Sequence, residues 1–214
     1  VQKAGAVFNV KKLDFLNGFY IRQKSAEKLT ELCIPYLAEK GLLAPIWGQK
    51  ELIVGVVKFP TEVTGYQIIE TKEIISFETL EKIVSLYRER LKKLSEISEL
   101  TDFFFKDRLE YDKDLLKWQD MTDKEIKVSL DKLESILSKI KSGQFSKENL
   151  EKILMPETEK MDPAPQKNRG YLLWPFRAAL TGKKASAGPF QIAEILGKEK
   201  VLKRIKEAKE LLKK

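Results

Sequence analysis

The segment from Arg169 to Gly182 holds the residues of this chain that are best suited to bind a nucleic acid. It places Trp174, Phe176 and Arg177 within four positions, just before a loop with two lysines. Aromatic rings and guanidinium planes stack on unpaired bases, and helix N-termini bind phosphates. The same residues also fit a helix that buries Trp174 and Phe176 in a core and exposes Arg177. The residue types alone leave both interpretations open.

The chain offers few groups for catalysis. It has no histidine among its 214 residues, which excludes every His-dependent triad and every HExxH zinc site. The loop Gly182-Lys-Lys-Ala-Ser-Ala-Gly188 resembles a phosphate-binding loop only faintly, because it lacks the GK[ST] ending and a preceding strand. The carboxylates are scattered over predicted helix faces, as is typical of solvated surfaces. The composition therefore favours binding over catalysis.

The positive charge is concentrated at the C-terminal end. The chain has 40 basic and 32 acidic residues, a net charge of +8. Residues 166–214 contain 13 basic and four acidic residues, so this segment carries +9 and residues 1–165 about −1. Such a distribution indicates a polyanionic partner, most often a nucleic acid. The alternative is a solvated helix surface, because lysine is common on helix faces.

The sequence also bears on the compartment. A single cysteine, Cys33, excludes an intramolecular disulfide and fits a reducing compartment, so we expect a cytoplasmic protein. Cys33 lies on the apolar face of a predicted helix, which indicates a core position. No apolar run approaches the roughly 18 residues of a membrane span, and no signal peptide is recognisable. The chain does not begin with Met, and we expect it to be a piece of a longer protein.

The spacing of apolar residues predicts an all-α, multihelical fold. A helix is expected from the cap Ser25 to Gly41, with a kink or break at Pro35. A long helix begins after Ser76, with its inward positions at Leu80, Ile83, Val84, Tyr87, Leu91 and Leu94. Short β-prone runs separated by Pro60 and Gly65 predict a small hairpin or an irregular insertion over residues 51–75.

The second half repeats these helical signals. Phe103, Phe104 and Phe105 are expected to fill a core. Thr122-Asp-Lys-Glu125 reads as a capping box. The expected helices are a short one at 115–118, one from 122 that Gly143 stops, one from Ser146 to near Pro156, one at 171–181, one at 189–196 and a last one after Gly197. Residues 156–169 and 182–188 are expected to be loops.

Several segments resemble bacterial glutamyl-tRNA synthetase, a class I enzyme, and they occur in that family's order across nearly the whole chain. They are Ala6-Val-Phe-Asn9, Lys12-Leu-Asp-Phe-Leu-Asn-Gly-Phe-Tyr-Ile-Arg22, Tyr87-Arg-Glu-Arg-Leu-Lys-Lys-Leu-Ser-Glu-Ile97, Leu100-Thr-Asp-Phe-Phe-Phe105, Trp174-Pro-Phe-Arg-Ala-Ala-Leu-Thr-Gly182 and Phe190-Gln-Ile-Ala-Glu-Ile-Leu-Gly-Lys198. Residues 51–75 and 156–168 match poorly and are expected to be variable insertions.

The resemblance implies that this chain is the C-terminal, anticodon-binding part of the enzyme. Residues 1–21 would end the stem-contact region, 22–118 would form a first helical subdomain, and 119–214 a second one with a basic tail. The domain that uses ATP and Mg²⁺ to activate glutamate would lie upstream, so no cofactor is expected in this chain. The implied partner is the glutamate tRNA, bound by a monomer without a membrane.

The resemblance also implies residue roles. Arg90 matches an arginine that reads the third anticodon base, and Arg177, beside Trp174, matches one in the anticodon pocket. Ser186, Gly188 and Pro189 match a segment that touches the anticodon through its backbone, although Pro189 has no N–H to donate. We further expect Lys183, Lys184 and Lys206 to contact phosphates.

Arg90 has a simpler interpretation, an ordinary ion pair on a helix surface. No acidic residue lies three or four positions away from it, which weakens that alternative. For the chain as a whole, the alternative is a stand-alone helical RNA-binding or scaffold protein that reuses the fold without ligase activity.

Overall fold

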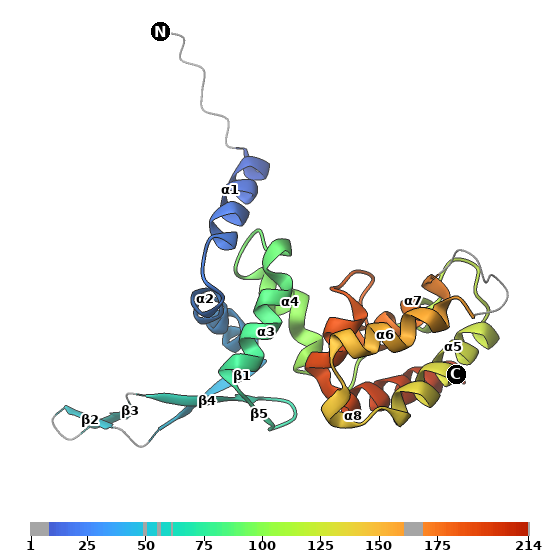
Figure 1. Ribbon diagram of the computed structural model, residues 1–214. Coiled ribbons are helices and arrows are strands. Elements are labelled where there is room, and N and C mark those ends of the chain that lie inside the picture. The colour runs from blue at the N-terminus through green and yellow to red at the C-terminus, as the bar shows by residue number, and fades with distance from the viewer. Residues whose placement is uncertain (1–8, 49–50, 55–56, 61, 161–168, 214) are drawn as a thin grey trace, which may run out of the picture. The chain divides into compact units, whose positions relative to one another are not determined.

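The computed structural model describes residues 9–48, 51–54, 57–60, 62–160 and 169–213. The chain divides into two compact units, Val1–Phe105 and Lys106–Lys214 (Figure 1). Both units are mainly helical, and the first also carries a small set of β-strands. The predicted fold class, all-α with a small β insertion, is confirmed.

The described residues of the first unit form four α-helices. They are α1 (Val10–Arg22), α2 (Ala26–Glu39), α3 (Phe77–Tyr87) and α4 (Glu96–Thr101), with the 3-10 turns η1 (Arg88–Arg90) and η2 (Asp102–Phe104). Ser25 and Ser76 each accept a hydrogen bond from a backbone N–H three residues further on, which confirms both predicted caps. Gly41 follows α2 with a φ of +68°, a left-handed conformation that glycine adopts readily.

These helices differ from the predictions at two points. Pro35 does not break α2, which runs on through it to Glu39. Both Cys33 and Leu37, on either side of Pro35, are fully buried, so packing outweighs the one backbone bond that proline removes. The helix after Ser76 is shorter than predicted and ends at Tyr87, because Leu91 reaches the core in an extended conformation instead.

The strands begin earlier than predicted. β1 (Leu43–Trp47), β4 (Val63–Ile68) and β5 (Ile74–Ile75) form an antiparallel sheet in the order β1-β4-β5, and β2 (Glu51–Val54) pairs with β3 (Val57–Pro60). β1 was not predicted because Pro45 argues against a strand at this place in the sequence. The proline is tolerated there because β1 is an edge strand. Gly65, expected between strands, lies inside β4 opposite Ile46.

The second unit packs helices around the last one. Its elements are η3 (Lys113–Leu116), α5 (Asp123–Lys139), η4 (Ser142–Gln144), α6 (Lys147–Thr158), α7 (Gly170–Thr181) and α8 (Pro189–Leu211). α5, α6 and α7 all contact α8. The capping box of Thr122 and Glu125 and the cap at Ser146 are confirmed. α8 is interrupted at Gly197, whose φ of +78° separates the two predicted helices.

Three helix ends in the second unit differ from the predictions. Residues 115–118 form no α-helix, and η3 is a 3-10 turn that ends at Leu116. α5 ends at Lys139, before Gly143 is reached. α6 passes through Pro156 to Thr158, where the Thr158 hydroxyl donates to the Met155 carbonyl.

Buried side chains form one core in each unit. In the first, Phe103 and Phe105, each 1% exposed, lie in the core as predicted, together with the inward faces of α2 and α3. In the second, the core comes from the apolar stripe of α5 and from Leu172, Phe176 and Ile205. None of the helices in the described ranges combines the length and apolarity that a bilayer crossing requires.

The division between the units lies before residue 106, whereas the expected boundary follows residue 118. The stretch 106–118 makes contacts inside the second unit. The Arg204 side chain donates to the Lys106 carbonyl at 3.1 Å, and Trp174 Nε1 donates to the Leu115 carbonyl at 2.8 Å. These contacts bind the segment to α7 and α8.

Candidate nucleic-acid interface

α7 carries Trp174, Phe176 and Arg177, the residues whose types suit nucleic-acid binding. Phe176 is fully buried and anchors the helix, whereas Trp174 and Arg177 are half-buried. The structure thus combines the two interpretations of this segment, with Phe176 in the core and Trp174 and Arg177 partly accessible. Because Trp174 also donates a hydrogen bond to the Leu115 carbonyl, its ring has a fixed position.

The ring of Trp118 packs against the ring of Trp174. The rings of Trp118 and Trp174 lie 4.9 Å apart with an interplanar angle of 43°. A Cβ on Gly170 would lie 2.3 Å from the Trp118 ring, so only glycine fits at the start of α7 beside this pair. No local sequence pattern indicates the contact between Trp118 and Trp174, because 56 positions separate the two residues.

Contacts with Trp174 and with the segment after α7 hold Arg177 in one orientation. Its guanidinium carbon lies 4.3 Å from the centre of the Trp174 ring, a cation–π contact. Its two terminal nitrogens donate to the Lys184 carbonyl at 3.0 Å and to the Ser186 hydroxyl at 3.4 Å. A guanidinium that is ordered beforehand loses less entropy when it binds a ligand.

The loop between α7 and α8 folds back over Arg177. It starts at Gly182, whose φ of +62° ends α7 in a left-handed cap. Ser186 is 8% exposed, and its hydroxyl donates in turn to the Ala187 carbonyl at 3.1 Å. Gly188 is exposed, and Pro189 is the first residue of α8. The loop therefore brings four residues together, and we call them the α7–α8 cluster: Trp174, Arg177, Lys184 and Ser186. Lys183, Gly188 and Pro189 lie next to these residues in the sequence.

Some basic side chains of the C-terminal tail are already paired with carboxylates, so fewer of them can bind phosphates than the net charge suggests. Lys203 pairs with Asp107, and Lys209 pairs with Asp131 and Glu134 of α5. These hydrogen bonds raise the pKa of both lysines, so each stays charged but shares its charge with a carboxylate. Lys206 is more accessible, with 66% of its side chain exposed and its nitrogen 4.0 Å from a Glu134 oxygen.

Arg204 is a structural residue despite its place in the tail. It is 1% exposed and donates to the carbonyls of Leu180 and Lys106. The sequence did carry a signal for this, because Arg204 shares a helix face with Val201, Ile205 and Ala208, all fully buried. The tail charge that faces solvent is correspondingly smaller than the +9 counted from the sequence.

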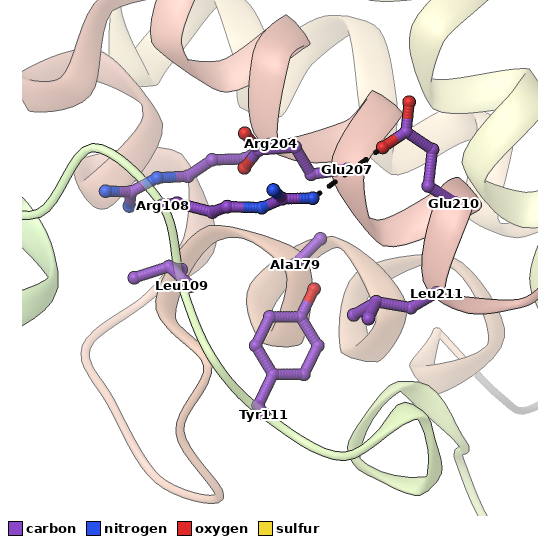
Figure 2. A pocket seen from close by; sticks show the side chains of 8 residues that line it. All are labelled: Arg108, Leu109, Tyr111, Ala179, Arg204, Glu207, Glu210 and Leu211. Atoms are coloured by element: carbon purple, nitrogen blue, oxygen red, sulfur yellow. Dashed lines mark ion pairs between the residues drawn. The ribbon is translucent and has the colours of Figure 1, made fainter. Parts of the chain in front are cut away.

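A small cavity lies beside Arg204 (Figure 2). Its volume is about 40 Å³, and it is lined by Arg108, Leu109, Tyr111, Ala179, Arg204, Glu207, Glu210 and Leu211. Arg108 and Glu210 form an ion pair of 3.9 Å at its edge, and burial raises the pKa of the Tyr111 hydroxyl. Such a volume holds about three water molecules at most, so the cavity is too small for a nucleotide or an amino acid.

Arg90 belongs to the first unit and lies at the end of η1. It is exposed, and with the described residues its side chain makes no ion pair or hydrogen bond. The neighbouring residues are engaged, since Glu89 lies 3.8 Å from Arg22 and Arg88 donates to the Lys24 carbonyl. The interpretation of Arg90 as an ordinary ion-pair residue thus finds no support among the described residues.

The chain is similar to known proteins over most of its length. The family model described as "Anticodon binding domain" matches residues 28–209. A glutamate–tRNA ligase of Clostridium tetani is 36% identical over 216 residues, covering 100% of this chain and 36% of that protein. Glutamate–tRNA ligase 1 of Caldicellulosiruptor saccharolyticus is 31% identical over 209 residues, covering 96% of this chain and 36% of that protein.

A solved structure shares the fold. The glutamate tRNA ligase of Elizabethkingia meningosepticum, crystallised in complex with its amino acid, superposes with a TM-score of 0.69 at 23% identity and covers 98% of this chain and 34% of that one. The chain thus spans about a third of the length of the relatives it matches. Because the family model takes in most of its residues, the chain belongs to the anticodon binding domain family.

Proposed function

We propose that this chain recognises the anticodon of the glutamate tRNA as the C-terminal part of a glutamate–tRNA ligase. The observation that carries the proposal is the α7–α8 cluster, in which Arg177 is stacked on Trp174 and tied to the loop by Lys184 and Ser186. A stacked arginine with ordered donors suits an unpaired base, which offers both a ring face and acceptor atoms. The relatives named above, all glutamate–tRNA ligases, support the choice of substrate.

The remaining residues take complementary roles in this proposal. Arg90 reads a second base, because it is exposed and has no partner among the described residues. Ser186 and Gly188 line the base through the loop backbone, and Pro189 contributes shape without an N–H donor. Lys183, Lys184 and Lys206 contact phosphates, which position the RNA without reading its sequence.

The chemistry of the whole protein lies outside this chain. The longer protein would join glutamate to ATP as an adenylate and transfer the glutamyl group to the 3′ end of the tRNA. With no histidine and no nucleotide-binding loop, the residues of this chain supply the recognition part of that reaction. We place the protein in the cytoplasm as a monomer.

The salt dependence of binding tests whether these lysines meet phosphates. If Lys183, Lys184 and Lys206 neutralise about three phosphates, the logarithm of the affinity should fall with the logarithm of the salt concentration at a slope of about −2 to −3. The measurement is a filter-binding titration of the glutamate tRNA at several salt concentrations. Lys206→Gln should make the slope shallower by about one unit. A slope near zero would contradict the proposed RNA contacts.

A further inference from the structure

Trp118 packs against the ring on which Arg177 is stacked. The Arg177 guanidinium carbon lies 4.3 Å from the centre of the Trp174 ring, and that centre lies 4.9 Å from the centre of the Trp118 ring. Trp174 is thus the middle member of a chain of contacts. Trp118 follows Leu115 by three positions, and the Leu115 carbonyl accepts the hydrogen of the Trp174 indole. Residues 115–118, which lie outside α7, therefore hold the Trp174 ring in place.

The Trp118 ring fits closely against the start of α7. A Cβ on Gly170 would lie 2.3 Å from the Trp118 Nε1 and Cε2 atoms, far inside van der Waals contact. Any side chain at this position would push the ring away from its present place, because packed atoms cannot approach so closely. Gly143 in η4 offers a comparison, since a Cβ there would meet nothing within 4 Å. The two glycines therefore allow the Trp118 ring to be displaced without changing Trp118 itself.

The segment before Trp118 also touches the loop that holds Arg177. A Cβ on Gly182 would lie 3.0 Å from the Cδ1 atom of Tyr111, so the Tyr111 ring packs against the residue that ends α7. The loop that begins there supplies the carbonyl and the hydroxyl that accept hydrogen bonds from Arg177. Residues 111–118 therefore contact both the ring under Arg177 and the start of its loop.

We propose that Trp118 is a positioning residue for anticodon reading, which acts on Arg177 through the Trp174 ring. The inference rests on the proposed function, because it takes Arg177 as the residue that meets the base. The hydrogen bond to Leu115 fixes the Trp174 indole nitrogen but leaves the plane of the ring free to tilt about that point. Contact with the Trp118 ring limits this tilt, so the guanidinium is ordered before RNA binds.

Two different substitutions remove this support. Trp118→Leu deletes the ring, and the glutamate tRNA should then bind about 3- to 10-fold more weakly, since a long side chain must be ordered on binding. Trp118→Phe should restore most of the affinity, because a smaller ring still packs against Trp174. Gly170→Ala displaces the ring and should cause a similar loss, whereas Gly143→Ala should bind as tightly as the unsubstituted chain.

A double-mutant cycle separates positioning from direct contact with the RNA. In an Arg177→Gln background, Trp118→Leu should cause no further loss of affinity, because a residue that acts only through Arg177 has nothing left to position. Losses that add in full would overturn the proposal, since Trp118 would then contact the RNA itself or support the fold in general.

The NMR signals of the Arg177 side chain test its position without RNA. Protons stacked 4.3 Å from the centre of the Trp174 ring are shielded by it, so these signals, identified by their absence in Arg177→Gln, should lie upfield. Trp118→Leu and Gly170→Ala should move them toward the values of an unstacked arginine, and Gly143→Ala should not. Unchanged signals in both of the first two variants would overturn the proposal.

The same signals distinguish this proposal from the proposed function. If they move as expected while the unsubstituted chain binds the glutamate tRNA and a copy with a replaced anticodon equally, Trp118 remains the residue that positions Arg177. That result would refute the proposed function alone.

Discussion

Arg177→Gln should weaken the binding of the glutamate tRNA by about 1–3 kcal/mol, or about 5- to 150-fold. Glutamine keeps a polar end but loses the planar fork that stacks on Trp174 and donates to Lys184 and Ser186. It also loses the charge that strengthens a hydrogen bond to a base acceptor. The measurement is the dissociation constant of the purified variant, after circular dichroism has shown an unchanged helix content.

Two further variants separate recognition from charge. Arg177→Lys keeps the positive charge but not the fork, so it should lose nearly as much affinity as Arg177→Gln. Lys206→Gln removes an exposed charge on α8 and should weaken all tRNAs alike, because phosphates carry no direct sequence information. An Arg177→Lys chain that binds as tightly as the unsubstituted one would show that Arg177 is a generic cation.

Arg204→Met should lower the free energy of unfolding of the second unit by about 2–5 kcal/mol. Methionine fills part of the same space but cannot donate to the carbonyls of Leu180 and Lys106, which the 1% exposed arginine now reaches. Buried carbonyls without donors cost far more than the loss of an exposed ion pair. Without the hydrogen bond from Arg204 to its carbonyl, Lys106 and the segment that follows it should also become more mobile.

The matched control is Lys203→Ala, one position earlier on the same helix. Lys203 is 45% exposed and pairs with Asp107, so its loss should cost no more than about 1 kcal/mol. Urea unfolding followed by tryptophan fluorescence suits the comparison, because Trp118 and Trp174 both lie in the second unit. Equal shifts of the midpoint for the two variants would show that Arg204 is not a structural residue.

Local signals in the sequence predicted helix starts better than helix ends. Ser25, Ser76, Ser146 and the Thr122 capping box each satisfy backbone N–H groups within three residues, so the necessary information is local. The ends depend on packing with distant residues. Leu91 keeps helical spacing in the sequence, yet it is buried through an extended backbone after η1.

The candidate site was predictable in its residue types but not in its contacts. The combination of Trp174 and Arg177 followed from their position before a basic loop. The ring of Trp118 and the carbonyl of Leu115 come from far along the chain, and no periodicity reveals them. The pairing of Lys209 with Glu134 is likewise invisible, because 75 positions separate the two, and it lowers the charge that the tail offers to RNA.

The most direct test of anticodon recognition compares two RNAs with the unsubstituted chain. One is the glutamate tRNA, and the other is the same tRNA with only its anticodon bases replaced, so that every phosphate contact is retained. Recognition of the anticodon predicts that the replaced RNA binds about tenfold more weakly or worse, since a single wrong base costs about 1–3 kcal/mol. Equal affinity for the two RNAs would contradict it and leave a chain that binds tRNA through its phosphates alone.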